Sequence, residues 1–307
     1  MTANKLRAAI LFASAIATAV AQDANSEKEL VPNGRRMGTL LNPGGGNDKE
    51  PPGQAGKPAK PGNNGISYHG GPVMLNTVNV YYIWYGNWAG NTAPQILTEL
   101  ASNIGGSSYF LINTTYTNGS GGAVSGNVAY KGSTTVAYPY GTSLTDAQIQ
   151  KVVSDAITTA ALPKDTNGVY FVLTSADVTA SSGFCTQYCG WHTHGTIAGS
   201  DIKYSFVGNP DRCPSSCAAQ TTGPNGNAGA DGMASIIAHE LEEATTDPDL
   251  NAWYDTRGYE NADKCAWTFG TTYTVNGAKA NVKLGTRDYL IQRNWVNASG
   301  GYCSMTF

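Results

Sequence analysis

The sequence predicts an α/β fold of the α+β type, in which a mixed, twisted sheet packs against one long helix. Short runs of β-branched and aromatic residues lie between glycines, as in strands. They alternate with runs whose apolar residues recur at helical spacing. All six cysteines lie at or beyond Cys185, so disulfides are expected to brace the C-terminal half.

Each element is predicted by a local pattern. Strands are expected where aromatic and β-branched residues cluster, at 78–85, 168–174 and 201–207. Helices are expected at 92–104, after a capping box of Thr145 and Gln148, and at 231–247. The stretch 106–142 has short bursts of Gly, Ser, Thr, Tyr and Val, which favour hairpins. The last helix is expected to start at Asp231, a possible N-cap, and to end before Pro248.

The N-terminus has the pattern of a secretory signal peptide over residues 1–21. Lys5 and Arg7 precede a short apolar run, and small residues at 19 and 21 form a cleavage site. Residues 22–64 are rich in Pro and Gly and lack aromatic residues, which predicts a disordered tail or a removable pro-segment. The folded domain is expected at 65–307. We therefore expect a secreted, extracellular protein without a transmembrane segment.

The charge of the chain is weakly acidic. The formal net charge is −3, and cleavage after residue 21 removes two more basic residues and no acidic one. Phosphate binding needs a basic surface, so nucleic acid is excluded as a partner. We expect a monomer.

The cysteines fit an oxidising compartment, where disulfides form. The two Cys-x-x-x-Cys pairs leave a structural zinc as the alternative, and the sequence does not choose among the pairings. The six residues are Cys185, Cys189, Cys213, Cys217, Cys265 and Cys303. Sequons at Asn113, Asn118 and Asn297 permit N-glycans, as in a glycoprotein, if the host is eukaryotic.

The helix at 231–247 carries the pattern His239-Glu240-x-x-Glu243. Residues four apart share a helix face, so His239 and Glu243 can bind one cation, as the two histidines of a His-Glu-x-x-His metalloprotease helix do. Glu240 would then be the general base on a metal-bound water. The mixed ligand set favours Zn²⁺, with Ca²⁺ as the alternative. A core histidine beside a solvated acidic face is the structural alternative.

Further ligands are expected from outside this helix. The imidazoles of His192 and His194 lie on one side if their segment is extended, and we expect that segment to be a disulfide-braced loop. Carboxylates follow the helix closely. The additional candidate ligands are His192, His194, Asp247, Asp249, Glu260 and Asp263. Surface histidines and capping acids are the structural alternatives.

Several segments resemble the Exordium / phosphate-induced protein 1 family of secreted proteins. They are Tyr68-His-Gly-Gly-Pro-Val-Met, Val80-Tyr-Tyr-Ile-Trp-Tyr-Gly-Asn-Trp, Gly183-Phe-Cys-Thr-Gln-Tyr-Cys-Gly, Phe206-Val-Gly-Asn-Pro-Asp-Arg-Cys-Pro-Ser-Ser-Cys and the segment 226–265. The resemblance spans residues 66–307. It implies an apoplastic or cell-wall protein linked to cell expansion and growth signalling, a family without a settled biochemical activity.

Two functions are consistent with these patterns. The first is a secreted zincin-like metallohydrolase, a peptidase, since the order of strands and helices is compatible with a single zincin-like domain whose sheet packs on an active-site helix. The second is a non-enzymatic cell-wall binding or growth-signalling protein with a structural cation or none. A peptide or a cell-wall component is the expected partner. A carbohydrate-active protein is a third hypothesis, because paired acids and many aromatic residues suit sugar binding.

Overall fold

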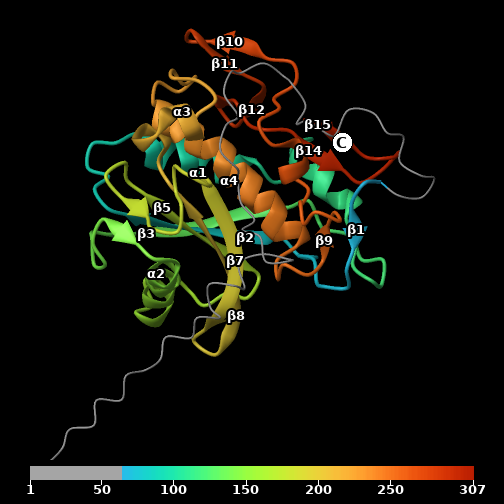
Figure 1. Ribbon diagram of the computed structural model, residues 1–307, viewed down its shortest axis with the longest axis horizontal. Coiled ribbons are helices and arrows are strands. Elements are labelled where there is room, and N and C mark those ends of the chain that lie inside the picture. Colours follow the sequence, from blue (N-terminus) through green and yellow to red (C-terminus); the bar gives the residue numbers. More distant parts are fainter. Residues whose placement is uncertain (1–63) are drawn as a thin grey trace, which may run out of the picture.

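The computed structural model describes residues 64–307. The expected signal peptide at 1–21, and all but the last residue of the expected tail at 22–64, lie outside the described residues and stay predictions. The described chain has a central five-stranded sheet with helices on both faces (Figure 1). It thus confirms a mixed fold of helices and sheet.

The central sheet combines parallel and antiparallel strands. In spatial order these are β3 (Val128–Val136), β2 (Val78–Tyr85), β5 (Gly168–Thr174), β8 (Ser200–Val207) and β7 (Gly190–Ile197). The first four run parallel, and β7 runs antiparallel to β8. Ala198 and Gly199 join β7 to β8 with positive φ angles at both positions, which suits a two-residue hairpin turn. The sheet therefore ends at an antiparallel edge strand.

The first two helices lie in connections between parallel strands, and helices cover both faces of the sheet. The helices are α1 (Ala93–Asn103), α2 (Asp146–Thr158), the single turn α3 (Pro214–Cys217) and α4 (Ala228–Thr246). α1 and α4 lie on one face of the sheet, and α2 lies on the other (Figure 1). α4 contacts β7, β8 and β5, so it crosses the half of the sheet that ends in the antiparallel edge.

Short pairs of strands and 3-10 turns surround this core. The pairs are β1 (Ser67–Tyr68) with β9 (Trp253–Tyr254), β4 (Ser143–Leu144) with β6 (Thr179–Ala180), β10 (Tyr273–Val275) with β11 (Ala278–Ala280), β12 (Val282–Leu284) with β13 (Arg287–Tyr289), and β14 (Asn294–Val296) with β15 (Tyr302–Ser304). The 3-10 turns are η2 (Phe110–Thr115), η3 (Pro210–Arg212) and η4 (Asp263–Cys265). β14 contacts both η2 and η4, and so holds these two turns beside α4.

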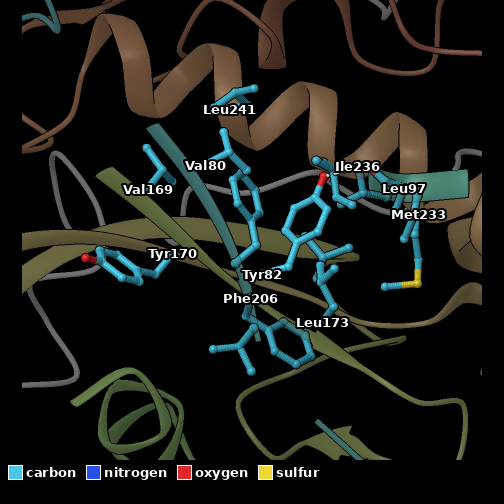
Figure 2. Close-up of a cluster of buried hydrophobic side chains, with 14 of the residues drawn as sticks. Val80, Tyr82, Leu97, Val169, Tyr170, Leu173, Phe206, Met233, Ile236 and Leu241 are labelled. Carbon is cyan, nitrogen blue, oxygen red and sulfur yellow. Dashed lines mark hydrogen bonds between the residues drawn. The ribbon is translucent and has the colours of Figure 1, made fainter. Parts of the chain in front are cut away.

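Large side chains fill the space between α4 and the sheet (Figure 2). Tyr82 of β2 is fully buried, and its hydroxyl donates to the carbonyl oxygen of Leu97 in α1 at 3.1 Å. Its ring lies edge-on to Phe171 of β5, with centroids 5.9 Å apart. Ile236 and Leu241 of α4 are also buried. A buried hydroxyl without a partner is costly, so the bond from Tyr82 helps to fix α1 against the sheet.

α4 is buried on every side. All of its 19 residues except Ala228 and Gly232 are buried, including Glu240, Glu242 and Glu243. The alternative of a solvated acidic face is therefore wrong, because α1, η2 and β13 pack against the helix in addition to the sheet. A buried helix with polar groups must satisfy those groups inside the protein.

The start of α4 differs from the prediction. Asn227 is the N-cap, and its side-chain oxygen accepts the backbone N–H of Ala230 at 3.0 Å. Asp231, the predicted cap, lies inside the first turn. Its carboxylate accepts the backbone N–H of Asn225 at 3.0 Å and the side-chain amide of the same residue at 2.6 Å. Asp231 thus closes the loop before the helix, and Asn227 caps the helix itself.

The other predicted strands and helices are confirmed, with one exception. β2 and β5 have the predicted bounds, and α2 begins with both hydrogen bonds of the expected capping box. The prediction of hairpins across 106–142 is wrong for most of this stretch, which forms η2 and then β3, a strand that pairs in parallel with β2. One antiparallel bridge, between Thr117 and Ala123, closes a short turn of the predicted kind. The predicted loop around His192 and His194 is also wrong, since both residues lie on β7.

The cysteines form three disulfides, which rules out the alternative of a structural zinc held by the two Cys-x-x-x-Cys pairs. The bonds are Cys185–Cys213, Cys189–Cys217 and Cys265–Cys303. Of the three sequons, Asn113 is fully buried, so the folded chain has no room for a glycan there. Within residues 64–307, no helix is long and apolar enough to cross a membrane.

We predict that Asn227→Ala lowers the free energy of unfolding by about 1–2 kcal/mol, because it removes the N-cap of α4. It also removes the bond from the Asn227 amide to Asn91, 2.8 Å long. Asn227→Asp is the control, since it keeps the capping oxygen and should cost less. Urea unfolding checks both values, and equal stability of Asn227→Ala and the wild type would contradict this role.

Candidate metal centre

The candidate centre is built on the C-terminal half of α4. His239 and Glu243 lie one turn apart, and the atoms that face each other, Nε2 and Oε1, are 2.9 Å apart. Both side chains are buried, yet Nε2 of His239 has no hydrogen-bond partner among the described residues. Two polar atoms that are close without being aligned for a hydrogen bond resemble two ligands directed at a common ion.

A carboxylate from a later segment joins this pair. Asp263 opens η4, and its Oδ1 lies 3.5 Å from Nε2 of His239. The backbone N–H of Asp263 donates to Oε1 of Glu243 at 3.0 Å and so orients that carboxylate. The ligand atoms of His239, Glu243 and Asp263 all lie within 4.8 Å of one another. The disulfide from Cys265 to Cys303 fixes the backbone two residues further on.

β7 brings a second imidazole to the other oxygen of Glu243. His192 is fully buried, with Nδ1 3.5 Å from Oε2 of Glu243 and 3.6 Å from Oε2 of Glu240. These three residues also offer ligand atoms within 4.8 Å of one another. Gly190 permits this close approach, since a Cβ there would lie 2.6 Å from the side chain of Ile236.

The cluster concentrates negative charge away from water. Burial raises the pKa of Asp263, and the carboxylate of Glu243 raises it further, to about 7. Burial and Glu243 likewise raise the pKa of Glu260 well above its usual value. For His192, burial would lower the pKa, but the facing carboxylates of Glu240 and Glu243 outweigh burial and raise it to about 10. Without a cation, the cluster must therefore hold extra protons to balance its charge.

Several buried atoms of the cluster have no hydrogen-bond partner within the described part of the chain. They are Nδ1 of His192, Oε2 of Glu243, both carboxylate oxygens of Glu260, and Oδ1 of Asp263. An unpaired buried polar atom costs about 1–3 kcal/mol, and such atoms are rare in folded proteins. All of these atoms are of types that bind metals. The residues present therefore fit a divalent cation.

Two predicted ligands lie at the border of the cluster. Oδ1 of Asp247 accepts the backbone N–H groups of Asn251 and Ala252, both at 2.6 Å, and so shapes the turn that follows α4. Burial raises the pKa of Asp247 to about 6. Oε1 of Glu260 lies 3.7 Å from Nε2 of His192. Among the described residues, neither Asp247 nor Glu260 belongs to the group of ligand atoms around His239 or to the group around His192.

His194 lies apart from the centre. It shares a face of β7 with His192, as predicted, but it is half-buried and its Nδ1 is 2.8 Å from Asp201. Lys203, which pairs with His194 across the strands, places its Nζ 2.5 Å from Asp201 and 3.1 Å from Asp249. An ammonium group thus already supplies the positive charge that Asp201 and Asp249 need.

Glu242 is a buried acid whose position the sequence pattern did not reveal. It lies on another side of α4, beside the side chains of Tyr109 and Asn294. Burial raises its pKa well above the usual value, which favours the neutral carboxylic acid. Only the packing of η2 and β14 on α4 makes this environment, and helical periodicity does not report it.

The comparison with known families identifies the protein. The phosphate-induced protein 1 conserved region matches residues 66–289. The chain belongs to this family. The match contains every candidate ligand from His192 to Asp263, and it ends at Tyr289 in β13. The strands β14 and β15, and with them Cys303, follow the matched region.

Members of this Exordium / phosphate-induced protein 1 family from plants resemble the chain over most of its length. The chain is 34% identical to Protein EXORDIUM-like 3 of Arabidopsis thaliana over 280 residues, which cover 78% of this chain and 82% of that protein. Identity to Protein EXORDIUM-like 5 of the same plant is 31%, over 75% of each chain. Identity to Protein PHOSPHATE-INDUCED 1 of Nicotiana tabacum is 26%, over 64% of this chain and 69% of that protein. No solved structure matches the chain.

We predict that Asp247→Ala destabilises the protein by about 2–3 kcal/mol and leaves metal binding at the candidate centre unchanged. The substitution leaves the backbone N–H groups of Asn251 and Ala252 without this acceptor, whereas the ligand groups at His239 and His192 stay complete. Asp247→Asn is the matched control, because its side-chain oxygen can still accept both bonds. Chemical unfolding and metal analysis of the two variants test this prediction. Loss of metal from a folded Asp247→Ala protein would show that Asp247 is a ligand.

Proposed function

We propose that this family member is a metal-binding protein that holds Zn²⁺ with His239, Glu243 and Asp263. The observation that supports the proposal is the convergence of three buried ligand atoms that lie within 4.8 Å of one another. Zinc commonly takes a mixed set of imidazole and carboxylate ligands. Ca²⁺ takes six to eight oxygen ligands, so a set that contains imidazole favours Zn²⁺ over Ca²⁺.

The burial of the ligands favours a structural role for this cation. His239 is 1% exposed, Glu243 is 0% exposed and Asp263 is 6% exposed. Structural zinc sites are closed, whereas catalytic sites keep an open position for water or substrate. The cation would join α4 to η4 and balance the charge buried between them. In this proposal the protein is secreted, as its three disulfides suit, and it binds a peptide or a cell-wall component through its outer surface.

A zincin-like hydrolase is the second candidate, and the position of Glu240 favours it. Glu240 follows His239 on α4, and its Oε2 lies 3.6 Å from Nδ1 of His192. A carboxylate beside a bound zinc ion can act as general base for water. The packing of α4 on a mixed sheet that ends in an antiparallel edge strand is compatible with a zincin-like domain, as an analogy of fold alone.

We predict that the purified protein binds Zn²⁺ and that His239→Ala loses the ion at this site. A free Zn²⁺ concentration of 100 times Kd should raise the free energy of unfolding by about 2.7 kcal/mol. This increase corresponds to about 5–10 °C in Tm for a domain of this size. Elemental analysis and thermal unfolding, with and without a chelator, measure both effects. His194→Ala is the control, since it removes an imidazole outside the centre. The proposal fails if the wild type binds no Zn²⁺, or if His239→Ala keeps all of it. A larger response to Ca²⁺ than to Zn²⁺ would reverse the choice of metal.

We predict for the hydrolase that Glu240→Gln lowers peptide hydrolysis by about 10²–10⁴-fold, the range for loss of a general base. The substitution conserves shape, so the protein should stay folded, as circular dichroism can check. Cleavage of a peptide library by the wild type and the variant is the measurement. A wild type that cleaves nothing, or a variant as active as the wild type, would eliminate the hydrolase and leave the binding protein.

A further inference from the structure

The two groups of candidate ligands share one residue. Nε2 of His239 and the backbone N–H of Asp263 face Oε1 of Glu243, and Nδ1 of His192 faces Oε2 of the same carboxylate. Each group of three lies within 4.8 Å, but within residues 64–307 no such group contains both histidines. Ligands of one cation lie about 2.0–2.3 Å from it, so any two of them are at most about 4–4.6 Å apart. The two imidazoles are therefore placed for different ions.

The orientation of His192 directs its Nδ1 at the second group. Its Nε2 lies 3.4 Å from the backbone carbonyl oxygen of Asp247, and a carbonyl oxygen can only accept a hydrogen bond. Nε2 is therefore a donor, and Nδ1 faces the carboxylates of Glu240 and Glu243 at 3.6 Å and 3.5 Å. In the cation-free protein a proton on Nδ1 balances these carboxylates. A metal ion that replaces this proton would meet the lone pair of Nδ1 and both carboxylates.

The arrangement around His192 matches that of a metal-binding imidazole. Such a ring donates its second N–H to a carbonyl or a carboxylate, which fixes its orientation. Here the backbone oxygen of Asp247 accepts from Nε2, and the carboxylate of Glu260 lies 3.7 Å from the same nitrogen. Nδ1 of His192 has no hydrogen-bond partner among the described residues, and the ring is fully buried.

The charge of the cluster can accommodate more than one divalent cation. Four buried carboxylates, those of Glu240, Glu243, Glu260 and Asp263, lie around the two imidazoles. When all four carboxylates are ionised, they carry four negative charges. One divalent cation balances two of these charges, and two divalent cations balance all four. In the described chain, Glu243, Glu260 and Asp263 have ion pairs with histidine and none with Lys or Arg. The cluster of His194, Asp201 and Asp249 differs, because Lys203 supplies its positive charge.

We propose that the centre is binuclear, with two divalent cations bridged by the carboxylate of Glu243. His239 and Asp263 hold the first cation, and His192 and Glu240 hold the second. Cations bridged in this way lie about 3.5–4 Å apart. The proposal rests on the proposed function for the first cation and adds the second. It also assigns Glu240 as a ligand of the second cation.

The test counts metal ions in the full-length secreted protein. The protein is stripped with a chelator, loaded with Zn²⁺ alone, freed of excess ion and analysed for zinc per chain. We expect two ions in the wild type and in His194→Ala, and one in His192→Ala. His194→Ala is the matched control, because it removes an imidazole from the same strand, two residues away, outside the cluster.

A measurement on the wild type makes the test independent of the folding of variants. Loading with Mn²⁺ alone should give the electron paramagnetic resonance spectrum of an exchange-coupled pair. One zinc per chain with an isolated six-line manganese spectrum would overturn the binuclear centre and leave the proposed function intact. Binding of neither metal would overturn both. Two ions in His192→Ala would also overturn the assignment of His192.

Discussion

The central constraint on this structure is the burial of carboxylates on a helix that water does not reach. α4 crosses the face of the sheet with neighbours on every side, so the acids of its second half have no solvent to hydrate them. Removal of a carboxylate from water costs several kcal/mol unless an opposite charge or a proton compensates. The imidazoles of His239 and His192 begin this compensation. Within residues 64–307, unpaired atoms remain around these imidazoles.

The surrounding fold keeps these groups in place from three separate parts of the chain. β7 presents His192 from the antiparallel edge of the sheet, and Gly190 lets that strand approach α4 closely. α4 supplies His239 and the shared carboxylate of Glu243, and η4 supplies Asp263. The turn after α4, shaped by Asp247, leads the chain back toward this site. Such convergence needs rigid connections, and backbone hydrogen bonds and disulfides provide them.

The sequence predicted the features that depend on local patterns. β2 and β5 have the expected bounds because a fully buried parallel strand is a continuous apolar run between breakers. The facing of His239 and Glu243 follows from helical spacing alone. β3 escaped prediction because it is half-exposed and its partner is distant in sequence. The division of the candidate ligands into two groups was also not predicted from the sequence. This division depends on how β7 and η4, which are distant in sequence, pack on α4.

The disulfide between Cys265 and Cys303 connects the centre with the order in which the chain is made. His192, α4 and Asp263 all emerge from the ribosome before β15, which carries the cysteine that anchors η4. A nascent chain can therefore collect most of its ligands while η4 is still unanchored. Oxidation of the last cysteine then anchors η4, which carries Asp263. If the proposed cation is bound, its retention would distinguish an oxidised molecule from one whose synthesis or oxidation stopped early.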